Sequence, residues 1–153
     1  MTNLPLKRQS LIPRMDGILR DIELLRKLGA YPFEKFAGED YHFDVAKLHL
    51  REALEGVFHI GTHILARLNG GRGTEYKDIA RKLGEFGIVE KNFADTALAR
   101  MAGYRNRLTH FYAEIKPEEM YRILQNDLGD FEVFLHAVKN ILEHPEQFGL
   151  SVE

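Results

Sequence analysis

The densest group of reactive side chains in this sequence lies near residue 110. Arg105, Asn106, His110 and Tyr112 fall within a stretch of eight positions there. A histidine near its ordinary pKa can accept or donate a proton at neutral pH. An arginine can hold a phosphate through two parallel hydrogen bonds and favours the charge that develops on it during reaction. Arg105 and His110 together therefore form a minimal set for cleaving RNA without a metal ion.

In such a reaction the histidine would activate the ribose 2′-hydroxyl for attack on the adjacent phosphorus, and the arginine would hold the non-bridging oxygens. The leaving 5′-oxygen also needs a proton, so a second copy of the site from a dimer partner would help. Five residues along an ideal helix separate Arg105 and His110 by about 140°, so the pair meets only if Arg105 reaches around or the helix loosens. Arg107 could also hold phosphates, although a solvated surface charge is the better interpretation. The alternative for the whole stretch is a solvated helix end with ordinary side chains.

The reactive stretch ends a helical pattern in which apolar residues recur every three or four positions. The pattern predicts a helix from about Glu90 to about Tyr112, with an apolar stripe of Phe93, Ala97, Met101, Tyr104, Leu108 and Phe111. Similar patterns predict helices over residues 12–28 and 41–68, a short helix capped by Thr74 and ended by Gly84 and Gly87, and a helix between Pro117 and His144-Pro145.

These helices predict an all-α, up-and-down bundle of four main helices plus one short helix. We expect one domain over residues 1–153, with its core at about 11–142 and both termini frayed. Asp40 is expected to cap the second helix. Gly56 and Gly61 lie inside that helix and each costs about 1 kcal/mol against alanine, which indicates close approach of another helix.

The composition of the 153-residue chain excludes several classes of protein. It has no cysteine, which rules out disulfides, thiolate zinc sites and thiol nucleophiles. The net charge of −2 argues against a protein that coats nucleic acid non-specifically, but it allows a local basic site. No apolar run approaches the roughly 18 residues of a membrane span, and the first ten residues lack an apolar signal core. We therefore expect a cytoplasmic protein without membrane contact.

Three further patterns favour ordinary structure over a functional site. His59 and His63 share one helical face, as metal ligands can, but no neighbouring acid completes a recognisable ligand set. Glu39 and His42 have the Glu-x-x-His spacing of di-iron bundles, without a second copy. The glycine-rich loop at residues 70–73 lacks the Lys-Ser/Thr ending of a phosphate-binding loop and follows a helix, which favours a flexible connection.

The segment from Arg105 to Tyr112 matches the pattern Arg-x-x-x-x-His-x-Tyr, with the polar Asn106 after the arginine. This pattern resembles the HEPN superfamily and, within it, the HepT-like toxins. The long glycine-containing second helix, the short helix after it, the entry at residues 87–89 and the restart at Pro117 also follow that family's layout. The resemblance covers about residues 11–142, and every motif position is intact.

The resemblance implies a homodimer with the two motifs facing each other and a metal-independent endoribonuclease that needs no cofactor. Arg105 and His110 would be the catalytic pair, and Asn106 would orient them by hydrogen bonding. Tyr112 would be the residue to which a cognate nucleotidyltransferase, the antitoxin, adds AMP to silence the nuclease. A bulky anion at that position would block RNA and repel its phosphates.

A second hypothesis belongs to a different class of protein. The chain could be a non-catalytic helical module that binds a nucleotide or a partner nucleotidyltransferase through Arg105 and Tyr112. It would form a stable complex and leave RNA intact. A third, a metal-dependent bundle enzyme, has little support in the sequence and would need a bound metal.

Overall fold

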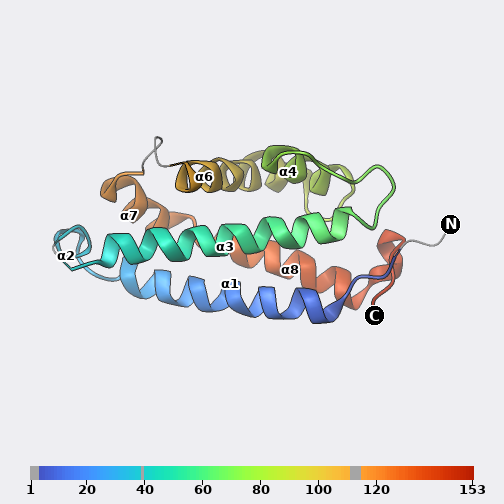
Figure 1. Cartoon of the computed structure of the whole chain (residues 1–153), viewed down its shortest axis with the longest axis horizontal. Coiled ribbons are helices and arrows are strands. Elements are labelled where there is room, and N and C mark those ends of the chain that lie inside the picture. Colours follow the sequence, from blue (N-terminus) through green and yellow to red (C-terminus); the bar gives the residue numbers. More distant parts are fainter. Residues whose placement is uncertain (1–3, 39, 111–114) are drawn as a thin grey trace.

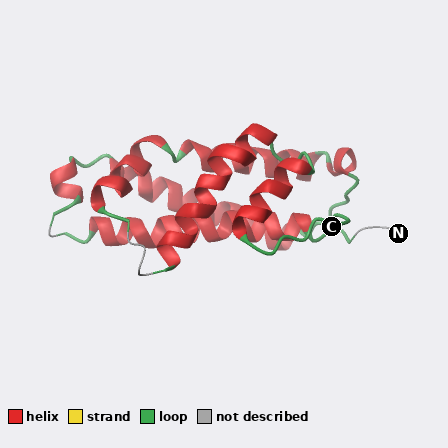
Figure 2. Ribbon diagram, turned by 90° about the horizontal axis from the view of Figure 1, so that it is seen from above, coloured by secondary structure: helices red, strands yellow, loops and turns green. Residues whose placement is uncertain are grey.

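The computed structural model describes residues 4–38, 40–110 and 115–153. Its helices run alternately along one long axis, and Figures 1 and 2 show the resulting elongated bundle from the side and from above. The predicted all-α, up-and-down bundle is confirmed, and within the described ranges the only β pairing is an isolated bridge between Leu6 and Val152. The elements are α1 (Arg8–Gly29), α2 (Phe33–Phe36), α3 (His42–Leu65), α4 (Tyr76–Glu85), α5 (Lys91–Phe93), the π-helical turn η1 (Ala94–Leu98), α6 (Ala99–Thr109), α7 (Pro117–Asn126), α8 (Gly129–Glu143) and the 3-10 turn η2 (Pro145–Phe148).

The long helices α1 and α3 pack against each other along most of their length (Figure 1). Gly56 of α3 permits this contact, because a Cβ there would lie 2.9 Å from Cγ1 of Ile18 on α1. Gly61 does the same for α4, where a Cβ would meet Ile79 and Leu83 at 3.1 Å. The close helix approach predicted from these glycines is confirmed, and it takes place within the chain.

The helix predicted from about Glu90 contains a π-helical turn. The segment begins with α5 at Lys91, widens through η1 and continues as α6. A π turn holds one more residue than an α turn, so it rotates the residues that follow relative to those before it. The wide turn lies against α4, since a Cβ on Gly84 would come within 2.6 Å of the Ala94 Cβ. Sequence spacing did not predict this turn.

Several other details differ from the predictions. The last predicted helix is split, because α7 ends at Asn126 and α8 begins at Gly129. The residue before α3 is Tyr41, and no side-chain hydrogen bond caps the helix, so the prediction of Asp40 as its cap is wrong. Described residues near the two ends of the chain are paired: Leu6 N–H donates to the Ser151 carbonyl at 2.8 Å, and Glu153 N–H donates to the Leu6 carbonyl at 2.8 Å.

One hydrophobic core joins the helices, from Leu6 at the N-terminal end to Leu150 near the C-terminus. Phe36, Phe58 and Phe134 are its largest fully buried side chains. In the described residues, no helix has both the length and the apolar character needed to span a membrane. This rigid bundle holds the end of α6, where the reactive stretch lies, against α3, α4 and α7.

Candidate functional site

The helix α6 ends at Thr109, earlier than the predicted end near Tyr112. The Thr109 hydroxyl donates to the Arg105 carbonyl at 2.9 Å, one turn back. His110 then adopts an extended backbone, with φ −97° and ψ 109°, while its N–H still donates to the Asn106 carbonyl at 3.1 Å. His110 is thus still bonded to the last turn of the helix, so the separation of about 140° from Arg105 holds for it, and its side chain is exposed. Tyr112, the predicted modification site, lies outside the described residues.

The Arg105 guanidinium is held by residues from two other helices. Its Nε donates to Oε1 of Glu55 on α3 at 3.1 Å, and its Cζ lies 4.0 Å from the centre of the Tyr76 ring on α4. The side chain is only 17% exposed, so both interactions are shielded from water. The guanidinium is therefore positioned before any ligand binds, as a catalytic arginine must be.

Asn106 contacts both members of the predicted catalytic pair. Its Oδ1 lies 3.5 Å from Nη1 of Arg105, at the outer limit of a hydrogen bond. Its backbone carbonyl accepts the N–H of His110. The orienting role expected for Asn106 is compatible with these contacts, although the stronger hold on Arg105 comes from Glu55.

His110 opens into a different part of the surface. It lines a cavity of about 290 Å³ that we call the basic hollow, formed by Lys47, Leu48, Arg51, Arg107, Leu108, His110 and Ile115. Arg105 is not part of this lining, and its neighbours Glu55 and Tyr76 lie elsewhere. The structure therefore places the predicted pair at the same end of α6, with Arg105 and His110 in different surroundings.

Arg107 ties α6 to α7 through two hydrogen bonds to Glu119, at 2.7 and 2.5 Å. The hydrogen bond from Arg107 lowers the pKa of Glu119, and the same bond raises the pKa of the Arg107 guanidinium. The interpretation of Arg107 as a solvated charge missed this partner. Glu119 lies 12 residues after Arg107 in the sequence, and no local spacing indicates the pair.

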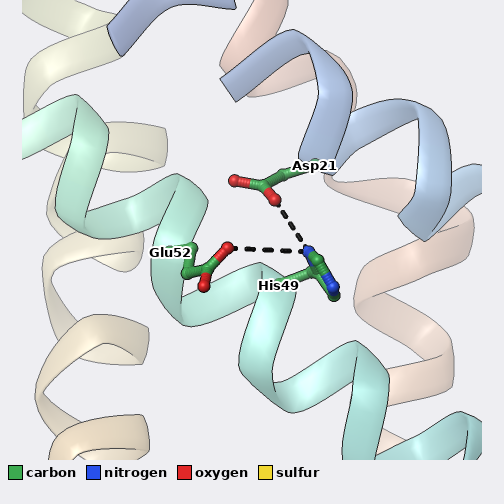
Figure 3. Close-up of side chains that lie close together, drawn as sticks. All are labelled: Asp21, His49 and Glu52. Carbon is green, nitrogen blue, oxygen red and sulfur yellow. Dashed lines mark hydrogen bonds and ion pairs between the residues drawn. The ribbon is translucent and has the colours of Figure 1, made fainter. Parts of the chain in front are cut away.

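The described residues also bring together a group that sequence reasoning missed. Figure 3 shows Asp21 of α1 facing His49 and Glu52 of α3. Nδ1 of His49 lies 2.8 Å from Asp21 and 3.7 Å from Glu52. Burial raises the pKa of Asp21. One imidazole and two carboxylates are side chains that can bind a metal ion. In this structure they form a hydrogen-bonded contact between α1 and α3.

The histidines that the sequence singled out have other partners. His59 lies 3.9 Å from Glu55, whereas Nε2 of His63 accepts the backbone N–H of Lys7 at 3.2 Å. His42 stacks on the Tyr31 ring, and Glu39 lies outside the described residues. These contacts agree with the interpretation of these histidines as packing and surface residues.

Comparisons with known proteins agree with the fold and with the resemblance to the HepT-like family. The model of the family described as "Ribonuclease HepT-like" matches residues 18–138. The chain is 25% identical over 134 residues to the tRNA nuclease HepT of Aphanizomenon flos-aquae, covering 84% of this chain and 87% of the relative. It is 27% identical over 96 residues to the mRNA nuclease HepT of Shewanella oneidensis, covering 63% of this chain and 71% of the relative.

Solved structures share the architecture. The tri-AMPylated HEPN toxin of Shewanella oneidensis, in complex with its MNT antitoxin, has a TM-score of 0.77 at 24% identity, covering 86% of this chain and 97% of that one. A toxin–antitoxin structure with AMP-PNP has a TM-score of 0.78 at 22% identity, covering 87% and 99%. At this level of sequence identity, the structural similarity supports the fold alone. Because the family model spans most of the sequence, the chain belongs to the ribonuclease HepT-like family.

Proposed function

We propose that this protein is the ribonuclease toxin of a toxin–antitoxin pair and that it cleaves RNA without a metal ion. The observation that carries the proposal is the end of α6. There the helix stops at Thr109, His110 lines the basic hollow, and Arg105 is held by Glu55 and Tyr76. A proton-transfer group and a fixed guanidinium thus lie at one helix end. The nuclease relatives at 25% and 27% identity support the same activity.

In the proposed mechanism His110 accepts the proton of the ribose 2′-hydroxyl as its oxygen attacks phosphorus. Arg105 stabilises the charge on the non-bridging oxygens, and Asn106 helps to orient the pair. The bond to the 5′-oxygen breaks, which leaves a 2′,3′-cyclic phosphate and a 5′-hydroxyl. The proton for the leaving oxygen comes from a second copy of the motif in a homodimer. Pairing of two copies would also offset the separation of Arg105 and His110 within one chain.

The proposal includes silencing by a nucleotidyltransferase antitoxin that adds AMP to Tyr112. One of the solved neighbours is an AMPylated toxin bound to its antitoxin, which supports this type of partner. Tyr112 follows His110 by two positions in the sequence. AMP on that side chain would add a negative charge two residues from His110 in the sequence and oppose the phosphates of an RNA substrate.

The test is RNA cleavage in excess chelator by wild type and His110→Ala, after intact mass has shown that Tyr112 carries no AMP. Size-exclusion chromatography should show a dimer for both proteins. The matched control is His136→Ala, which removes an exposed histidine of α8. We expect wild type and His136→Ala to cleave and His110→Ala to lose cleavage while it remains folded. If unmodified, dimeric wild type leaves all tested RNAs intact, the nuclease proposal fails for those RNAs.

The same experiment tests the non-catalytic module. One observation favours that alternative: Glu55 already partners the Arg105 guanidinium, and Arg105 does not line the basic hollow. A stable complex with nucleotide or with a nucleotidyltransferase, without any cleavage by unmodified protein, would support it.

A further inference from the structure

The described lining of the basic hollow is positively charged, although the chain as a whole has a net charge of −2. Three permanent cations, Lys47, Arg51 and Arg107, line it together with His110, and its described lining includes no acidic residue. A neighbouring cavity, which we call the mixed hollow, differs in this respect. Its lining combines Arg14, Arg51 and His59 with the acids Asp21, Glu52 and Glu55. Positive charge is therefore concentrated on the side of α3 that faces His110.

The three cations of the basic hollow are not equally available to a ligand. Arg107 already makes two hydrogen bonds to Glu119. Lys47 lies 3.6 Å from Asp44 and 4.5 Å above the Phe43 ring. Arg51 is exposed and, among the residues that the structure describes, makes no hydrogen bond or ion pair. An anion that bound Arg51 would therefore not have to displace a carboxylate.

Arg51 also lies between the two halves of the candidate site. It precedes Glu55, the partner of Arg105, by four residues on α3, so both side chains lie on one helical face. It lines the basic hollow together with His110 and the mixed hollow together with Thr109 and Glu55. A phosphate bound at Arg51 would thus sit next to the end of α6, within the region where Arg105 and His110 act.

We infer that Arg51 and the basic hollow form a phosphate-binding subsite for a single RNA strand beside the scissile bond. The cavity volume of about 290 Å³ is at the small end for ligand sites, which fits a phosphodiester group with part of its ribose. A guanidinium with no internal partner offers the paired donors that a phosphate accepts. This inference rests on the proposed function, because it assigns the subsite to the RNA that His110 cleaves.

The test separates binding from cleavage. Binding of a fluorescent single-stranded RNA is measured by anisotropy at several salt concentrations, using full-length, unmodified His110→Ala protein to prevent cleavage. Adding Arg51→Ala should lower the affinity about tenfold and reduce the salt slope by about 0.7, as expected for one lost phosphate contact to a single strand. Arg51→Lys should keep the slope and recover part of the affinity, because it keeps the charge and loses the paired donors. Arg20→Ala, which removes an exposed arginine of α1 outside both hollows, should change neither.

Cleavage is then measured with His110 intact. Arg51→Ala should lower kcat/KM about as much as it lowers affinity, mainly through KM, since Arg51 binds and does not transfer protons. If wild type cleaves while Arg51→Ala binds and cleaves like Arg20→Ala, the subsite is overturned and the proposed function stands. If wild type binds RNA through Arg51 without cleaving it, the subsite stands and the nuclease activity fails.

A competition arm distinguishes the possible sources of phosphate. Inorganic phosphate and AMP are titrated against the bound RNA in the same background. We expect both to compete only at concentrations far above the Kd of the RNA, because one phosphate offers a fraction of the contacts. If AMP instead binds tightly and depends on Arg51, while RNA binding does not, the hollow holds a mononucleotide and the RNA assignment is overturned.

Discussion

Acid should weaken the attachment of the N-terminal segment to α3 through one histidine. His63 lies partly buried near the C-terminal end of α3, and its Nε2 accepts the backbone N–H of Lys7 at 3.2 Å. Only a neutral imidazole can accept there. Burial lowers the pKa of His63 from 6.5 to about 4, with further contributions from the positive charges of Arg67, Lys7 and Arg14. The folded protein therefore resists protonation of His63, whereas the unfolded chain does not.

The sign and the size of the effect follow from this difference. Between pH 6.5 and 4 the unfolded state binds the proton more readily, so the free energy of unfolding falls as the pH decreases through that window. The full shift would correspond to about 3.4 kcal/mol at most. Because His63 is only partly buried, solvent and salt screen the nearby charges, and we expect about 1 to 2 kcal/mol. Well above pH 6.5, His63 is neutral in both the folded and the unfolded states, so this loss of stability does not occur.

Urea titrations from pH 7.5 to 4.5 measure this loss directly. The matched variant is His63→Gln, whose amide oxygen can accept the Lys7 N–H and does not titrate in this range. The wild type should lose about 1 to 2 kcal/mol more than His63→Gln between pH 7 and 4.5, while the two proteins differ little above pH 7. Parallel pH profiles for the two proteins would refute the assignment of a neutral, proton-resisting His63.

Three further substitutions test the packing and the charge distribution around the site. Gly84→Ala would place a Cβ 2.6 Å from that of Ala94, so α4 and η1 must separate, and thermal unfolding should show a loss of about 1 to 3 kcal/mol. Gly103→Ala on α6, where a Cβ meets nothing within 4 Å, should be neutral or stabilising; equal losses in both variants would contradict the argument. Glu119→Gln should cost about 1 kcal/mol at neutral pH, where the low pKa of Glu119 keeps it charged, and this difference should vanish as the pH falls through that pKa. The same change should tighten RNA binding several-fold, because it frees Arg107 in the basic hollow; unchanged affinity at low salt would show that Arg107 takes no part.

Apolar spacing predicted the bundle well because most helices bury one continuous stripe. It failed where buried residues keep helical spacing although the helix itself is interrupted. Leu124, Leu128 and Phe131 are all buried at helical spacing, so the pattern hides the break between α7 and α8. The π turn η1 packs against α4 at Gly84, a tertiary contact that no local pattern reveals. The paired termini likewise depend on contacts between the two ends of the chain.

Only the part of the candidate site formed by residues close together in the sequence was predictable. Arg105, Asn106 and His110 are neighbours in the chain, so a motif could identify them. Glu55 lies 50 residues before Arg105, and nothing in the spacing of either residue connects them. The early end of α6 was also beyond the pattern, because apolar spacing continues through Leu108 to Phe111, past the residue at which the backbone becomes extended.

Under the proposed function, these long-range contacts would give α3 a defined part in the chemistry that the motif alone does not reveal. A fixed carboxylate and a free guanidinium stand one helical turn apart on this helix, at Glu55 and Arg51. The carboxylate holds Arg105 in place and reduces its net charge, so Arg105 alone attracts RNA weakly and is better suited to act once the substrate is bound. The guanidinium of Arg51 retains its full charge next to His110 and can supply that binding. In the proposed mechanism the site would divide attraction and reaction between α3 and α6, which would explain how a chain of net charge −2 captures a polyanion at one end of one helix.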